Sequence, residues 1–293
     1  MIHLKEPSIR MLLFCCLIGF AMAALAAPAD PLIASLQTKL AESGHDPGPA
    51  DGVWGKNTEQ ALRAYQQQEG LTVNGRLDQT TARRLDLDLG AVDQSPGDIV
   101  DLLAAGKITV ETEWSGIQQV LVKVKPRVPY PVSVRIPVGT FFVSRNAASQ
   151  NMVATGAETI RLTDDDWVTV AMPAACANRP RNVPDGGDSF RVRRSPKQAD
   201  LGRLMPVLDR AKVGFAVRQA AVWIVTDNAD YADLGILIQN MGSRAIDASD
   251  AARAMRLCDE AGIDVERKAI WRDRKQIAAQ LGDSDLKRWL EQK

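Results

Sequence analysis

The spacing of apolar residues changes twice along the chain and divides it into three regions. In the first region, Ile33, Leu36 and Leu40 recur at the spacing of an amphipathic helix. Pro31 suits the first turn of that helix, because its missing N–H is not needed there, and Gly44 is a typical residue at the end. These positions predict a helix that begins near Pro31 and ends near Gly44.

Two more helices are predicted in the same region. The second carries Tyr65 on its apolar face, and Asp78 is placed to cap a third helix that buries Leu85. We therefore predict a three-helix domain over residues 28–90. An acidic segment rich in turn-forming residues, 88–97, reads as the linker that follows it.

Between residues 108 and 194 the pattern alternates with a period of two, as strands with one buried face do. Val120, Val122 and Val124 occupy one face of such a strand. The predicted strands are residues 110–114, 120–124, 132–136, 141–144, 152–155, 159–162, 167–172 and 189–192. Short strands at this spacing predict a central antiparallel β-sandwich over residues 98–195.

Helical spacing returns after residue 196 and continues to the end of the chain. Helices are predicted at residues 199–210 and 215–225, and a later one carries Met255 and Cys258 on its apolar face. The pattern leaves open whether these helices pack on the β domain or form their own bundle. The expected fold is a multidomain α and β chain with a C-terminal helical region at residues 196–293.

The first residues have the composition of a secretory signal. Lys5 and Arg10 precede an apolar run at residues 11–25, and small residues end at Ala26. We predict a signal peptide at residues 1–26 and a periplasmic or secreted protein; a retained membrane anchor is the alternative. No later apolar run is long enough to span a bilayer, so no membrane span is expected after cleavage.

Charge excludes some classes of partner. The chain has 36 basic and 36 acidic residues, and 45% of its residues are hydrophobic. This is the balance of an ordinary globular protein. Without a charge excess, neither nucleic acid nor an anionic membrane surface is expected as a partner.

The turn and core positions of the first region carry a specific resemblance. The pattern comprises Leu40, Gly44, Asp51-Gly52-Val53-Trp54-Gly55, Thr58, Ala61-Leu62, Tyr65-Gln66, Gly70-Leu71, Gly75, Leu77-Asp78 and Thr81. At this spacing it resembles the peptidoglycan-binding-like domain common in bacterial cell-wall proteins. The resemblance covers residues 31–87 and implies binding to peptidoglycan in the bacterial envelope. Some members of that family contact proteins, so an envelope protein is a second expected partner.

A shallow groove with an aromatic floor and a few polar groups would suit this ligand. The candidate ligand-binding residues are Trp54, Asn57, Thr58, Tyr65, Gln66 and Arg76. Each has a structural alternative. Trp54 and Tyr65 have the spacing of core residues. Thr58 is placed to cap a helix, and Arg76 is placed as a solvated charge at the rim.

The histidine count limits catalysis. Cleavage of the signal would leave His45 alone, so zinc hydrolases and Cys/His or Ser/His catalysis lack their residues. No catalytic residue, metal site or cofactor is therefore expected. A carboxylate glycosidase needs no histidine and remains the alternative, with Asp164-Asp165-Asp166 as its densest acidic cluster. Such a run more often forms a solvated turn.

Two cysteines remain after cleavage, Cys176 and Cys258. They could pair as a disulfide in an oxidising compartment, although Cys258 also suits a buried position on its helix. The sequence leaves both states open, because it does not place the two Cα atoms within bridging distance.

Residues 218–223, with the sequence Arg-Gln-Ala-Ala-Val-Trp, are similar to the Thr-Gln-x-Ala-Ile-Trp string of bacterial thioester adhesion domains. The resemblance implies an internal bond between that Gln and an upstream Cys, which here would join Gln219 to Cys176. Arg218 stands where that family has Thr. A helix with a buried apolar face is the alternative explanation.

Three functions follow from these patterns. The first is an exported, non-catalytic protein that binds peptidoglycan through its first domain and presents the other regions as an interaction surface. The second is a wall-lytic glycosidase that the same domain targets. The third is a protein–protein interaction module in the envelope.

Overall fold

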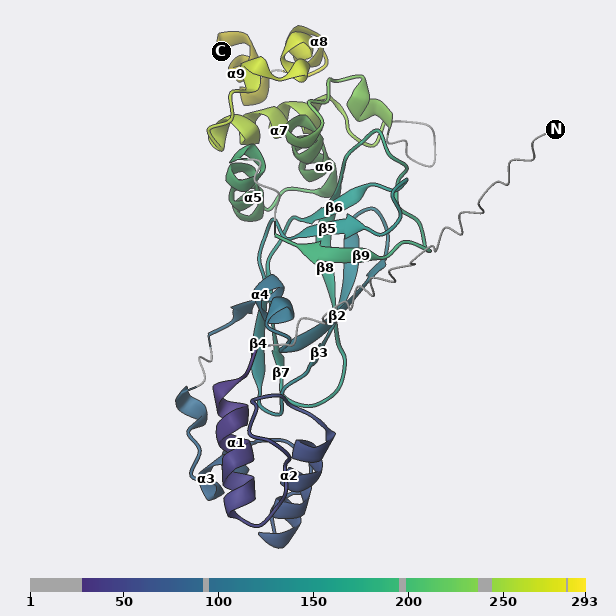
Figure 1. Ribbon diagram of the computed structural model, residues 1–293. Helices are drawn as coiled ribbons and strands as arrows, with labels where there is room; N and C mark the ends of the chain where they lie inside the picture. Colours follow the sequence, from purple (N-terminus) through teal and green to yellow (C-terminus); the bar gives the residue numbers. More distant parts are fainter. Residues whose placement is uncertain (1–27, 92–94, 195–198, 237–243, 283) are drawn as a thin grey trace, which may run out of the picture.

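The computed structural model describes residues 28–91, 95–194, 199–236, 244–282 and 284–293. Three regions follow one another in an elongated arrangement (Figure 1). Helices α1–α3 form one end, the strands form the middle, and helices α5–α9 form the other end. The predicted signal peptide lies outside the described residues. Within those residues, no helix is both long and apolar enough to traverse a bilayer.

The N-terminal module consists of α1 (Pro31–Glu42), α2 (Lys56–Gln68) and α3 (Gln79–Arg84). Helix α1 begins where predicted, because the Asp30 carboxylate accepts hydrogen bonds from the backbone N–H groups of Leu32 (3.0 Å) and Ile33 (3.4 Å). Asp78 caps α3 in the same way through the Thr81 N–H (2.8 Å). The apolar faces meet in a small core that contains Ile33, Leu36, Leu40, Leu62, Tyr65, Leu77 and Leu85.

A short connection leads from the module into the β region. It contains the 3₁₀ helix η1 (Leu89–Ala91), strand β1 (Gly97–Asp98) and helix α4 (Ile99–Ala104). Strand β1 pairs in parallel with β4 (Val132–Ile136), and β4 pairs antiparallel with β7 (Glu158–Leu162). These three strands form a small sheet next to the module.

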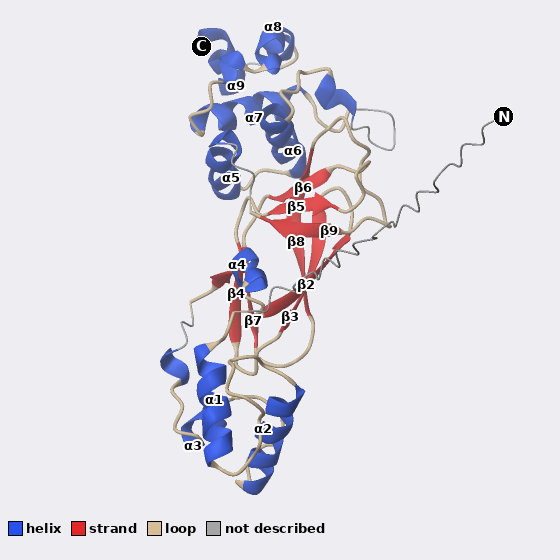
Figure 2. Ribbon diagram, in the orientation of Figure 1, coloured by secondary structure: helices blue, strands red, loops and turns tan. Residues whose placement is uncertain are grey.

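The other strands form one six-stranded antiparallel sheet. In spatial order they are β2 (Ile108–Trp114), β3 (Gln119–Pro126), β8 (Val168–Ala177), β6 (Asn151–Ala154), β5 (Phe141–Ser144) and β9 (Phe190–Arg193). The two outermost strands also meet. The Thr112 hydroxyl donates to the Phe190 carbonyl (2.7 Å) and accepts from its N–H (2.9 Å), while the Trp114 N–H donates to Asp188 (3.1 Å). The sheet is therefore barrel-like (Figure 2).

The mixed α and β architecture is confirmed, but the expected β-sandwich is not. Strand β3 buries Val120, Val122 and Val124 on one face, as the alternation predicts. A sandwich and a closed sheet both give each strand one buried face, so alternation cannot distinguish them. The contact between β2 and β9 does, because these are the two outermost strands of the sheet and the bridge between Glu113 and Ser189 brings its edges together.

The C-terminal region packs on the barrel through one helix. Helix α6 (Phe215–Thr226) lies between β8 and α7 (Ala248–Glu260), and Ala220, Val222 and Trp223 are fully buried there. The remaining elements are α5 (Ala199–Ala211), η2 (Asp233–Ile236), η3 (Val265–Arg267), η4 (Ala269–Asp273), α8 (Arg274–Ala279) and α9 (Asp285–Gln292). The helices therefore share one core with the barrel.

The disulfide that the sequence left open is not formed. Cys176 of β8 and Cys258 of α7 are both free and buried. Helix α6 contacts both elements and lies between them, which explains why the thiols do not meet. Burial raises the pKa of each thiol to about 12, so both are protonated at neutral pH.

The module is fixed to the barrel by a buried charged cluster. The Tyr130 hydroxyl donates to the Asp30 carboxylate, and the Lys107 ammonium lies 3.1 Å from the same oxygen. Asp30 is 8% exposed and Tyr130 is 2% exposed. Burial alone would raise the pKa of the Asp30 carboxyl, but hydrogen bonds from Tyr130 and Lys107 outweigh it and hold the pKa below its usual value.

Backbone contacts complete this attachment. The Leu77 N–H donates to the Pro129 carbonyl (2.9 Å), and the Arg76 guanidinium donates to the carbonyls of Val128 (3.0 Å) and Tyr130 (3.4 Å). The loop of residues 127–131, between β3 and β4, therefore serves as the docking segment for the module. Val128, Pro129 and Tyr130 of this loop are buried.

Replacing Tyr130 with Phe tests the charged cluster. We expect the free energy of unfolding to fall by about 2 kcal/mol, the usual contribution of a hydrogen bond to a charged group. The matched control is Tyr231→Phe, which removes a hydroxyl that donates to the uncharged amide oxygen of Gln280 (3.3 Å). Urea denaturation of both variants measures the difference. An equal loss in the two would contradict a special role for the carboxylate.

The same experiment has a pH dependence with a defined sign. Because folding lowers the pKa of Asp30, the ionised carboxylate contributes its full stabilisation to the folded protein above the unfolded carboxyl pKa of about 3.9. It is lost as the pH falls through the lower pKa of the folded state. We expect the difference in the free energy of unfolding between wild type and Tyr130→Phe to become smaller in that acidic range.

Candidate functional site

Two buried glutamines shape the turns of the module. The Gln37 amide of α1 donates to Asp51 (3.1 Å), the Val53 carbonyl (3.2 Å) and Thr58 (3.2 Å). Its amide oxygen accepts from the Gly52 N–H (2.9 Å). The side chain thus fixes the whole turn between α1 and α2.

Gln66 of α2 repeats this arrangement one helix later. Its amide donates to Asn74 (3.0 Å), the Arg76 carbonyl (2.9 Å) and Thr81 (3.2 Å), and its oxygen accepts from the Gly75 N–H (2.9 Å). Gly52 and Gly75 have φ values of +73° and +66° at matching positions, which favour glycine. The module is therefore an internal structural repeat of a glutamine-anchored turn.

This repeat separates the predicted ligand residues into two groups. Thr58, Tyr65 and Gln66 are 2%, 4% and 0% exposed and lie inside the module. The Tyr65 ring packs edge-on against His45 at 5.8 Å between centroids. Asn57 is exposed at the start of α2 but lines no groove with the others.

Trp54 and Arg76 do lie together. They line a hollow of about 170 Å³ with Glu59, Arg63 and Asn74 of the module, closed on the other side by Pro126, Arg127, Val128 and Asp165 of the barrel. A second hollow of about 240 Å³ shares Asn74, Arg76 and Asp165 with it. We call these two adjoining hollows the Arg76 groove.

Charges of both signs line the Arg76 groove. Burial lowers the pKa of the Arg76 guanidinium, although Asp165 and Asp164 oppose that shift, and its Nε–H has no hydrogen-bond partner. Arg63 pairs with Glu59 at 2.9 Å along the rim. The groove can therefore accept carboxylates and amides near its arginines and ammonium groups near its aspartates.

Sequence reasoning missed Arg63 and Asp165. Arg63 looked like an ordinary exposed helix charge, and its proximity to Gly75 follows from the turn geometry: a Cβ at Gly75 would lie 2.8 Å from the Arg63 Nε. Asp165 belongs to the acidic run predicted to form a solvated turn, and that run is exposed. It reaches the groove only because the β7–β8 turn faces the module.

The two residues of the thioester-like pattern are brought into contact. The Gln219 amide oxygen accepts from the Cys176 N–H (2.8 Å), and its NH₂ group donates to the Cys176 carbonyl (2.8 Å). Gln219 is fully buried on α6, and Cys176 is 2% exposed on β8. The plainer alternative, a helix with a buried apolar face, is also present, since Trp223 is fully buried.

Comparison with known proteins agrees with the resemblance of the first region. Residues 29–85 match the family described as "Putative peptidoglycan binding domain". No curated protein and no solved structure matches the chain. The N-terminal module is therefore a peptidoglycan-binding-like domain, of a family associated with the cell wall.

A pair of substitutions on one helix tests the structural role of Gln66. Gln66→Ala leaves the Gly75 N–H and the Thr81 side chain without their partner, so we expect a loss of about 3 kcal/mol in the free energy of unfolding. Gln60→Ala on the same helix changes an exposed side chain and should stay within about 0.5 kcal/mol. Denaturant titration measures both. Equal stability of the two variants would refute the anchoring role.

Proposed function

We propose that this chain is an exported, non-catalytic protein that binds peptidoglycan through its N-terminal module, in the periplasm or outside the cell. The single observation that carries the proposal is the Arg76 groove, an open polar groove on a module of the peptidoglycan-binding-like family. The barrel and the C-terminal helices would then present a surface to an envelope protein.

The chemistry of the groove supports this ligand. Peptidoglycan offers sugar faces, acetamido groups, peptide amides and carboxylates. The half-buried Trp54 ring provides an apolar face, and Arg63 and Arg127 provide donors for carboxylates at the rim. Of the six residues predicted from the sequence, we therefore keep Trp54 and Arg76 as ligand contacts and add Arg63.

The placement of the histidine supports a non-catalytic role. His45 is half-buried and packs edge-on against the buried Tyr65 ring of the module. Glu113, an acidic residue on β2, is paired with Lys123. Asp165 faces the Arg76 groove and lies 3.5 Å from the Lys125 ammonium. Each of these groups has a structural partner that accounts for its position.

Arg63→Ala tests the groove. We expect binding to purified, insoluble sacculi to weaken about tenfold, because a hydrogen bond to a charged group contributes at least 1.4 kcal/mol, roughly a factor of ten. The matched control is Arg256→Ala, since Arg256 forms the same kind of exposed helical pair with Glu260. Co-sedimentation with sacculi measures both variants and the wild type.

Three results would overturn the proposal. Equal binding by Arg63→Ala and Arg256→Ala would remove the groove as the site. Release of soluble muropeptides from sacculi would replace a non-catalytic protein with a lytic glycosidase. Absence of the wild type from the sacculus pellet would favour the protein–protein interaction module.

A second candidate function is favoured by the contact between Gln219 and Cys176. In thioester adhesion domains, which residues 218–223 resemble, such a pair is joined covalently. Here the Cys176 sulfur would attack the Gln219 carboxamide carbon: the S–C bond forms, the C–N bond breaks, and the nitrogen leaves as ammonia with the thiol proton. A primary amine could later displace the sulfur, forming an amide and restoring the thiol.

Intact-protein mass spectrometry tests the thioester. With the bond formed, the protein has a mass lower by one ammonia. Reaction with methylamine adds the mass of one methylamine and leaves an N-methyl amide at Gln219, so the product is heavier than the unmodified chain by one CH₂ group. Cys176→Ala should abolish the difference, whereas Cys258→Ala, at the other buried thiol, should retain it. A wild-type mass equal to that of the unmodified chain would refute the bond and leave Gln219 as a hydrogen-bonding anchor.

A further inference from the structure

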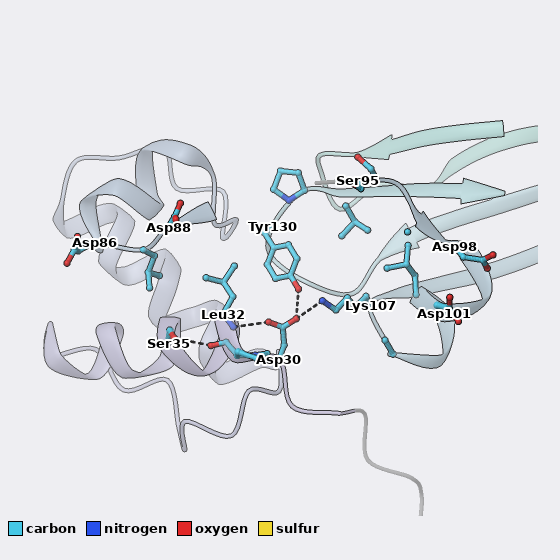
Figure 3. Close-up of a pocket in the computed structure, with 18 residues that line it drawn as sticks. Asp30, Leu32, Ser35, Asp86, Asp88, Ser95, Asp98, Asp101, Lys107 and Tyr130 are labelled. Carbon is cyan, nitrogen blue, oxygen red and sulfur yellow. Dashed lines mark hydrogen bonds and ion pairs between the residues drawn. The ribbon is translucent and has the colours of Figure 1, made fainter. Parts of the chain in front are cut away.

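One cavity lies between the module and the β region that follows it, where β1, α4 and the loop before β4 face the module. It has a volume of about 670 Å³, within the range of pockets that hold small ligands. Figure 3 shows its two walls, with Asp86 and Asp88 on the module side and Asp98 of β1 and Asp101 of α4 on the opposite side. The Asp30–Tyr130–Lys107 cluster lies between them. We call this cavity the interdomain pocket.

Apolar side chains line the interdomain pocket on both sides. Leu32 and Leu87 come from the module, and Leu102 and Val132 come from the barrel region. None of them belongs to the Arg76 groove. These walls suit the aliphatic part of a side chain that enters between the two regions.

The charge of the pocket lining indicates which charged group the ligand carries at the end of its aliphatic part. Five aspartates and one lysine line the pocket, and the lysine, Lys107, is already paired with Asp30 at 3.1 Å. Arg194, from outside the lining, pairs with Asp101. No cation among the described residues pairs with Asp86 or Asp88.

This distribution distinguishes between classes of ligand. Phosphate and carboxylate groups would be repelled by the aspartates. The carboxylates lie on opposite walls, and no group of three or more potential ligands in the described part of the chain is arranged to hold a metal ion. An ammonium group on an aliphatic chain matches both the charge and the apolar walls, because it can reach one wall while its methylene groups contact the leucines.

We propose that the interdomain pocket binds the side-chain ammonium of the diamino acid in the stem peptide of peptidoglycan. The choice of this source rests on the proposed wall binding, since Asp30, Leu32, Asp86 and Asp88 belong to the peptidoglycan-binding-like module or to the turns that flank it. The ammonium lies against Asp86 and Asp88, and the backbone carboxylates of the stem peptide remain outside the pocket.

Isothermal titration of the protein with a soluble stem tripeptide tests this proposal. We expect the tripeptide with a free side-chain amine to bind at least about tenfold more tightly than the same tripeptide acetylated on that amine, because a charge-assisted hydrogen bond is lost. Equal affinity of the two peptides would overturn the proposal.

Variants locate the effect in the pocket. The double variant Asp86→Asn, Asp88→Asn keeps the shape of the pocket. It also keeps the turn at position 88, in which the side-chain oxygen accepts from the Gly90 N–H (2.7 Å). We expect this variant to lose the preference for the tripeptide with the free amine. Asp46→Asn is the matched control, because Asp46 forms the same turn with Gly48 (2.9 Å) away from the pocket. A preference that survives in the double variant would place the ammonium elsewhere.

Sacculi with and without acetylated amines separate this proposal from the proposed function. Reduced retention on acetylated sacculi supports both. Equal retention on the two preparations overturns the pocket assignment and leaves wall binding intact. Failure to sediment with either preparation overturns wall binding, and tripeptide binding in that case would assign the pocket to a lysine from another source.

Discussion

The structure depends on one buried carboxylate that serves two regions at once. Asp30 caps the first helix of the module and receives Tyr130 and Lys107 from the barrel. A buried charge is tolerated only when partners satisfy it, so the helix start and the domain contact stabilise each other. The module is therefore fixed on the barrel. Both the Arg76 groove and the interdomain pocket lie along this contact, so their shapes depend on it.

Buried glutamine side chains are a second recurring feature that holds backbone segments in place. Gln37 and Gln66 each fix a turn of the module, and Gln219 fixes the end of β8 to α6. A glutamine amide has both donors and an acceptor, so one side chain can satisfy several backbone groups where regular pairing ends. Of the three, Gln66 was predicted as a ligand contact from the sequence. In the folded protein the Gln66 amide is already fully engaged by the chain itself.

The family match covers the module, yet both candidate binding regions are completed by residues of the β region that follows it. Asp165 and Val128 close the Arg76 groove, while Asp98 and Leu102 form one wall of the interdomain pocket. The second region is thus part of the binding surface that we propose. A wall-binding module docked in this way would recognise its ligand with residues from two domains.

Local spacing was sufficient to determine the helices of the module, the alternating strands and the identity of the first domain, because each depends on residues close in the chain. Capping by Asp30 and Asp78 followed from their place before an apolar helical face. Closure of the six-stranded sheet, the free state of Cys176 and the placement of Arg76 and Asp165 in one groove could not be predicted in this way. Each depends on which distant elements pack together, and the tertiary fold alone decided that, because many packings satisfy the same pattern of buried and exposed faces.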